Sequence, residues 1–142
     1  MRFWDTSALL PLVVAERVTR RAEQWLREDP AVVVWTLTRV ELLSGLARRR
    51  RESPRAARAL RAARDDLLSA WPQWTEVTAL AAVRRQAEQL VERHPLRAAD
   101  SLQLGAAMVA AEGMPATLEF VTFDRQQAQA ATLEGFRVLG SD

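Results

Sequence analysis

The sequence predicts an α/β fold, a three-layer sandwich with helices on both faces of a mostly parallel sheet of about five strands. Short segments typical of strands alternate with longer segments of helical periodicity. The run at 31–36 is continuously apolar and rich in β-branched residues, as in a strand buried on both faces. The chain has 142 residues, 49% of them hydrophobic, which is enough to bury one core, so a single domain over 1–142 is expected.

The strands and helices are expected in the order β-α-α-β-α-α-β-α-α-β-α-β. The expected strands span residues 2–5, 31–36, 71–77, 118–122 and 136–139, and the expected helices span 7–14, 16–28, 38–50, 53–69, 78–93, 98–112 and 124–134. Ser7 and Ser53 are expected to act as N-caps, and Pro54 fits a first helical position. Helices are expected to stop near Pro30, Pro95, Gly113 and Gly135.

Composition excludes several kinds of chemistry. The absence of cysteine excludes disulfides, thiolate ligands and a cysteine nucleophile. The single histidine, His94, excludes His-rich metal sites and is expected in a loop without a metal role. All 20 basic residues are arginine, so no mechanism can use a catalytic lysine. Arginine alone is consistent both with GC-rich codon usage and with phosphate recognition.

Nothing in the sequence suggests a membrane protein. No run of about 18 uncharged apolar residues is present, and the N-terminus lacks the apolar stretch of a signal peptide. We therefore expect a cytoplasmic protein. Trp4 and Trp35 are expected in the core, whereas Trp71 and Trp74 are expected to make packing or dimer contacts.

Four acidic residues lie near predicted strand ends. Asp5 ends the first strand and Asp124 follows the strand at 118–122. Glu41 lies one turn into the helix after 31–36, and Asp100 lies in the first turn of another helix. Ligands of parallel sheets bind beyond the carboxyl ends of the strands, so we expect these four acids to gather. Singly, each has an ordinary explanation, since Asp100 suits a helix N-terminus and Asp124 suits a cap.

Clustered carboxylates resist ionisation unless a cation neutralises them. Without histidine or cysteine ligands, such a cluster favours Mg²⁺ or Mn²⁺ over zinc. A metal held in this way supports in-line displacement at a phosphate.

The motifs around these acids resemble those of PIN-domain ribonucleases. They are Asp-Thr-Ser-Ala-Leu-Leu from Asp5, Thr-Arg-Val-Glu-Leu ending after Glu41, Leu-Arg-Ala-Ala-Asp-Ser around Asp100, and Val-Thr-Phe-Asp-Arg around Asp124. They occur in the family's order and span the chain from Asp5 to Gly135. Chain size and motif style look most like the VapC-type toxins of toxin–antitoxin pairs.

The resemblance implies a metal-dependent endoribonuclease in which the four acids hold one or two Mg²⁺ or Mn²⁺ ions, with Asp5 and Asp100 the closest ligands. Residues expected to orient the carboxylates by hydrogen bonds are Thr6, Ser7 and Thr122, although Ser7 also suits a plain N-cap. The implied partners are RNA, a small antitoxin protein whose tail blocks the site, and a second copy in a homodimer.

An arginine-rich segment at 48–64 contains eight arginines, opposed only by Glu52. Arg51, Arg55 and Arg58 have the spacing of one helical face. The opposite apolar stripe consists of Ala57, Leu60, Ala63 and Leu67. The segment is consistent with an RNA-phosphate track, a docking surface for an acidic partner, or a solvated helix face. The candidate RNA-binding residues are Arg48, Arg51, Arg55, Arg58 and Arg97.

Two other carboxylate-based families do not fit. A receiver domain needs a lysine, which is absent, and a haloacid-dehalogenase-like phosphatase needs an Asp where Ser7 stands. The alternative is a non-catalytic PIN-like domain that binds RNA or protein through 48–64, which leaves the four acids unexplained.

Overall fold

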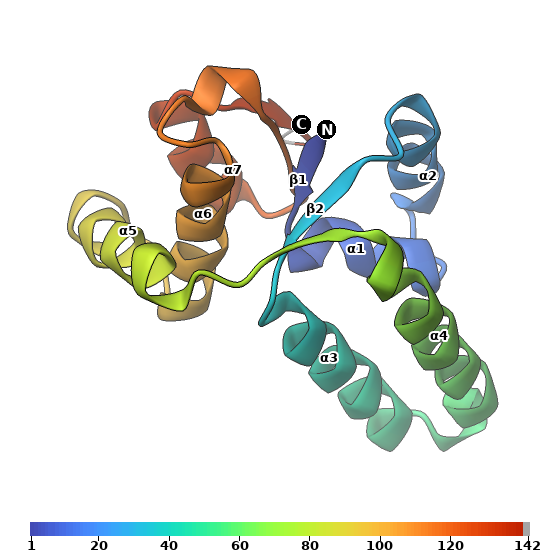
Figure 1. Ribbon diagram of the computed structural model, residues 1–142. Coiled ribbons are helices and arrows are strands. Elements are labelled where there is room, and N and C mark those ends of the chain that lie inside the picture. The colour runs from blue at the N-terminus through green and yellow to red at the C-terminus, as the bar shows by residue number, and fades with distance from the viewer. Residues whose placement is uncertain (141–142) are drawn as a thin grey trace.

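The computed structural model describes residues 1–140 and contains a five-stranded sheet. Its strands are β1 (Arg2–Trp4), β2 (Val32–Trp35), β3 (Thr75–Val77), β4 (Glu119–Val121) and β5 (Arg137–Leu139). Every neighbouring pair is parallel, and the spatial order is β3-β2-β1-β4-β5. The predicted α/β sandwich is therefore confirmed (Figure 1).

Helices cover both faces of this sheet. They are α1 (Thr6–Val13), α2 (Thr19–Glu28), α3 (Thr38–Glu52), α4 (Ala57–Ala70), α5 (Leu80–Arg93), α6 (Ala98–Ala110) and α7 (Arg125–Leu133). Short 3-10 turns lie at Pro54–Ala56, Trp71–Gln73 and Pro115–Thr117. The order of elements agrees with the sequence prediction. The second helix begins three residues later than expected, at Thr19, whose hydroxyl instead joins the turn before it by accepting from the Glu16 N–H.

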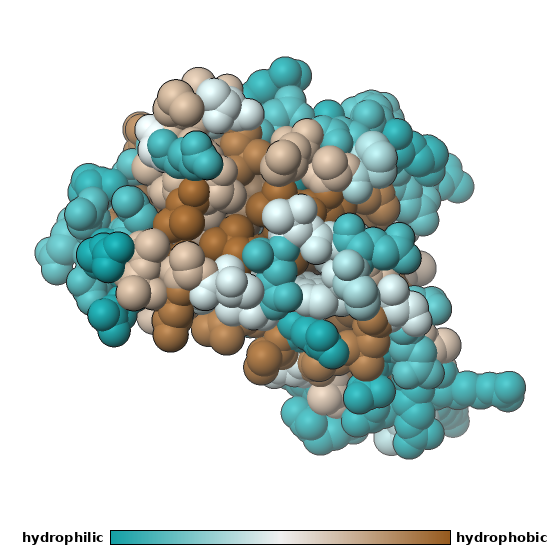
Figure 2. Space-filling view, in the orientation of Figure 1, coloured by the Kyte–Doolittle hydropathy of each residue, from teal (hydrophilic) through white to brown (hydrophobic). Residues whose placement is uncertain are grey.

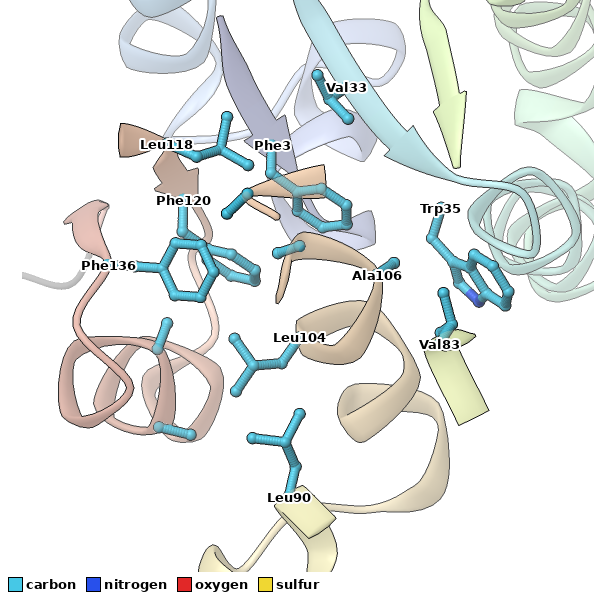
Figure 3. Close-up of a cluster of buried hydrophobic side chains, with 14 residues drawn as sticks. Phe3, Val33, Trp35, Val83, Leu90, Leu104, Ala106, Leu118, Phe120 and Phe136 are labelled. Carbon is cyan, nitrogen blue, oxygen red and sulfur yellow. The ribbon is translucent and has the colours of Figure 1, made fainter. Parts of the chain in front are cut away.

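Strand residues alternate between two cores because successive side chains point to opposite faces of a sheet. Phe3 and Phe120 pack with α5, α6 and α7, and the two rings stack at 5.3 Å between centroids (Figure 3). Trp4 and Val121, their neighbours in sequence, pack with α1 to α4. Burial on both faces explains why the inner strand β2 is a continuous apolar run, whereas the edge strands β3 and β5 contain polar, exposed residues.

The tryptophan predictions agree with this packing. Trp4 and Trp35 are fully buried, one in each core. Trp71 is also buried, and Trp74 packs against it at 5.7 Å between ring centroids.

The carboxyl ends of the strands meet at one edge, and this edge carries the candidate site. Trp4 lies beside Val121 in the β1–β4 register, so the residues that follow them, Asp5 and Thr122, are neighbours. The Asp5 N–H donates to the Val121 carbonyl at 3.2 Å, which continues the ladder by one step. β2 ends nearby and leads into α3 (Figure 1).

The arginine-rich segment is not one helix, so Arg51, Arg55 and Arg58 do not share one helical face as predicted. Ser53 and Pro54 separate α3 from α4, and the two helices form a hairpin that extends away from the sheet (Figure 1). Ser53 makes no capping hydrogen bond, so that prediction is wrong. The predicted apolar stripe is correct in that Leu60, Ala63 and Leu67 are buried against the core. The far end of the hairpin is hydrophilic (Figure 2).

Within residues 1–140, no helix combines the length and apolar character needed to cross a membrane.

Candidate active site

Asp5 is the most buried of the four acids, with 3% of its surface exposed. It is the N-cap of α1, where its Oδ1 accepts from the Ala8 N–H at 3.0 Å and from the Ser7 hydroxyl at 2.7 Å. Its Oδ2 accepts from the Thr122 hydroxyl at 2.5 Å. Three donors from two strand ends therefore hold this carboxylate in one orientation.

Ser7 is not the N-cap expected from its position, because Asp5 occupies that role. Its hydroxyl instead donates to Asp5 and accepts from the Phe123 N–H at 2.9 Å. Thr122 has a similar double contact, since its Oγ1 also accepts from the Asp124 N–H at 3.0 Å. Both hydroxyls thus connect the loop after β1 to the loop after β4.

Glu41 lies on the first turn of α3 and is held by two other elements. The Thr6 hydroxyl at the start of α1 donates to Glu41 Oε2 at 3.0 Å. The Gln103 amide on α6 donates to Glu41 Oε1 at 3.1 Å. The same Gln103 Nε2 lies 2.7 Å from Thr38 Oγ1, at the start of α3, and 3.0 Å from Thr6 Oγ1.

Gln103 and Thr38 are site residues that sequence reasoning missed. Both are buried, and together they fix the side of the site formed by Glu41. A signal for Gln103 was present, because it stands three residues after Asp100 and is the one amide in the otherwise small and apolar sequence of α6 beyond Ser101. Residues three apart share a helix face, so this amide and Asp100 face the same side.

Asp100 and Asp124 form the outer part of the site. Asp124 is the N-cap of α7, with its Oδ1 accepting from the Gln127 N–H at 2.8 Å. Asp100 lies in the first turn of α6 and is partly exposed. Arg97, immediately before α6, lies close enough to Asp100 for its charge to favour ionisation of that carboxyl.

Electrostatic interactions join the four acids in a row. Burial raises the pKa of Asp5 to about 7, and the charge of Asp124 adds to the increase. Burial also raises the pKa of Glu41, with a further contribution from Asp100. The pKa of Asp100 is raised by burial and by Asp124. Each carboxylate thus affects its neighbour, and among residues 1–140 no arginine forms an ion pair with any of the four.

This donor set suits a hard divalent cation. In the described part of the chain, no three acidic or histidine side chains stand close enough to form a ready-made metal cage. Mg²⁺ does not require one, because it is usually held by one or two carboxylates and keeps water and phosphate as its other ligands. An all-oxygen row of acids, three of which have raised pKa values and none of which is ion-paired with an arginine within residues 1–140, therefore fits Mg²⁺ or Mn²⁺.

The other candidate residues are spread over the surface. Arg48 lies on α3 two turns after Glu41, whereas Arg51, Arg55 and Arg58 lie around the end of the hairpin, away from the acids. His94 also lies apart from the four acids, since its Nε2 is 2.7 Å from Glu134 Oε1. That contact ties the end of α5 to the end of α7.

Comparisons with known proteins identify the family and the fold. Residues 2–133 match the model of the PIN domain family. Two solved structures share the fold, each with a TM-score of 0.67 and 16% identity. One is a toxin-antitoxin complex from Klebsiella pneumoniae, in which the match covers 100% of this chain and 98% of that chain. The other is FitAcB from Neisseria gonorrhoeae, with 98% and 96% covered.

A search of curated proteins found no match. The family match covers more than nine-tenths of the sequence and includes all four acids. The chain therefore belongs to the PIN domain family.

Proposed function

We propose that the protein is a metal-dependent endoribonuclease whose active site consists of Asp5, Glu41, Asp100 and Asp124. The observation that carries the proposal is the row of four acids at the carboxyl edge of the sheet, with three pKa values raised and no ion-paired arginine among residues 1–140. Such a row is costly for the fold unless a cation and a phosphate complete it. Membership of the PIN family, whose members are generally nucleases, supports the same assignment.

The four acids have different surroundings and are proposed to have different roles. Asp5 and Asp100 would be the closest metal ligands. Asp5 is held in place by hydrogen bonds from Thr122 and Ser7, whereas Asp100 is partly exposed and would face the substrate. Glu41, oriented by Thr6 and Gln103, and Asp124 would act directly or through water.

A bound Mg²⁺ or Mn²⁺ would neutralise charge on the scissile phosphate and promote ionisation of the attacking water. The protein's own contribution is positional. The hydroxyls of Thr6, Ser7 and Thr122 keep the carboxylate oxygens in place, so little reorganisation is needed when substrate binds. The exposed arginines at 48, 51, 55, 58 and 97 are proposed to contact RNA phosphates.

A toxin role with a cognate antitoxin is proposed from the VapC-type motifs and from the fold shared with the Klebsiella pneumoniae toxin-antitoxin complex. A homodimer is proposed on the same basis. Expression with the neighbouring gene tests the first point, since a small protein should copurify and suppress cleavage. Light scattering of the purified chain tests the second.

The direct test of the nuclease proposal is cleavage of diverse RNAs by purified protein with Mg²⁺, with Mn²⁺ and with a chelator. Wild type should cleave only with metal, and Asp5→Asn should abolish cleavage. If wild type and Asp5→Asn are equally inert with both metals, the proposal fails and a non-catalytic binding domain becomes the better explanation.

A further inference from the structure

A groove begins at Glu41 and runs along α3. Its volume is about 370 Å³, and it is lined by Thr6, Leu10, Val40, Glu41, Ser44, Gly45 and Arg48. One wall is the start of α1 and the other is α3. Because α-helices rise 1.5 Å per residue, Arg48 stands about 10 Å from Glu41 along the α3 axis. The groove thus has an acidic end inside the candidate active site and a basic end outside it.

Gly45 has no structural reason to be glycine. It lies in the middle of α3, where glycine is less stable than alanine. A Cβ built at Gly45 has no atom within 4 Å, so tight packing does not require its absence. At Gly105 on α6, by contrast, a Cβ would lie 2.9 Å from the Val83 carbonyl oxygen, so packing accounts for that glycine. The open space beside Gly45 is in the groove, where it leaves room for a ligand to approach the α3 backbone.

The lining chemistry matches a nucleotide. Leu10 and Val40 offer apolar surface for a base, and Val40 is 62% exposed. Thr6 and Ser44 offer hydroxyls, and Arg48 is exposed and forms no ion pair within residues 1–140. Figure 2 shows hydrophobic surface over the start of α3, beside the hydrophilic end of the hairpin. A volume at the lower end of the range for ligand pockets suits one unpaired nucleotide and not a duplex.

We propose that the groove from Glu41 to Arg48 binds one nucleotide of single-stranded RNA next to the scissile phosphate, and that Gly45 keeps it open. This inference rests on the proposed nuclease function. In it, Leu10 and Val40 contact the base, Arg48 contacts the adjoining phosphate, and the strand passes over the α3 backbone at Gly45.

The test fills the groove without disturbing the fold. At Gly45 a Cβ meets no atom within 4 Å, and leucine favours a helix over glycine, so the melting temperature of Gly45→Leu should equal or exceed that of wild type, by up to about 4 °C. Ala62→Leu is the control, because it also introduces a leucine, at an exposed position of α4 outside the groove. Two substrates are compared in Mn²⁺: a fluorescent single-stranded oligoribonucleotide, and bis(p-nitrophenyl) phosphate, which has no flanking nucleotide.

For Gly45→Leu, the loss of kcat/KM on the oligoribonucleotide should exceed the loss on the small ester by about tenfold or more, because only the former needs the groove. Ala62→Leu should match wild type on both. Equal losses on the two substrates, or wild-type cleavage of RNA by folded Gly45→Leu, would overturn the inference.

Binding of the same oligoribonucleotide, measured by fluorescence anisotropy, separates this inference from the nuclease proposal. If wild type binds RNA but never cleaves it, the nuclease proposal fails, while a rise in Kd of about tenfold for Gly45→Leu still supports the groove. Equal Kd values for wild type and Gly45→Leu contradict the groove whether or not the protein cleaves.

Discussion

Asp5 and Asp100 belong to the same acidic row but differ in how the fold treats them. Asp5 is buried and accepts three hydrogen bonds, from Ser7, Ala8 and Thr122. Asp100 is partly exposed at the start of α6, and its strongest neighbours are the charges of Asp124 and Arg97. Asp5 thus connects the ends of β1 and β4 by hydrogen bonds, whereas Asp100 is accessible to a ligand. Substitution of either acid should therefore impair metal binding and cleavage, but substitution of the inner acid should also change the stability of the fold.

The largest effect that should leave the fold intact comes from Asp100→Asn, which removes the outer charge and keeps the side-chain size. RNA cleavage should fall about a thousandfold, because charge stabilisation of the reacting phosphate is worth several kcal/mol. The melting temperature without metal should not fall, since repulsion with Asp124 is relieved. Asp65→Asn, at an exposed acid on α4, is the control and should cleave like wild type. If Asp100→Asn cleaved RNA as fast as wild type, the proposed role of Asp100 as the outer metal ligand would be contradicted.

The inner acid should dominate the pH dependence of stability without metal. The pKa of Asp5 is raised to about 7, so the folded state binds a proton that the unfolded state releases near pH 4. Its contribution to stability is complete below pH 4 and is lost as the pH rises through 7, by an amount on the order of 4 kcal/mol. Urea unfolding of wild type and Asp5→Asn between pH 4 and 8 measures this. If the free energy of unfolding changed with pH in the same way in both proteins, the raised pKa of Asp5 would be contradicted.

Thr122→Val tests how much the hydrogen bond from Thr122 to Asp5 contributes to metal affinity and stability. It removes the hydroxyl that donates to Asp5 and accepts from the Asp124 N–H. We expect Mn²⁺ affinity to fall about 10- to 100-fold, as for other groups that orient metal ligands, and the free energy of unfolding to fall by about 1–3 kcal/mol. Thr132→Val, whose hydroxyl donates to the Ala128 carbonyl on the same helix, is the control. Calorimetric titration with Mn²⁺ measures the affinity, and equal affinities in both variants would show that Asp5 needs no such support.

The smallest effect is expected farthest from both acids, at the end of the hairpin. Arg55→Ala and Arg58→Ala should each raise the Kd for single-stranded RNA a few-fold and reduce the slope of log K against log salt by about 0.7. Anisotropy titrations at several salt concentrations measure the slope. Arg85→Ala, on α5 at the other face of the sheet, should leave it unchanged. Identical slopes for all three variants would assign the hairpin arginines to solvation or to another partner.

The contrast between the two acids also shows what local sequence can predict. The order of elements was predictable because apolar runs and helical periodicity are local patterns, and the acids were found because they follow strand ends. The N-cap alternative for Ser7 was wrong because α1 begins at Thr6, so Asp5 is the cap, and Ser7 instead donates to the Asp5 carboxylate. Two features were not predictable from local sequence: the hydrogen bond from Gln103 on α6 to Glu41 on α3, and the turn after Ser53 that separates the arginines into two helices. Both depend on how the helices pack in three dimensions.

The most direct test of a shared metal site is a Mn²⁺ titration, followed by electron paramagnetic resonance, of wild type, Asp5→Asn and Asp100→Asn at pH 7.5. The site as described requires wild type to bind Mn²⁺ and both variants to lose that binding, the inner one as completely as the outer. Wild-type affinity in either variant, or no binding by wild type, would contradict a metal centre shared by the two acids.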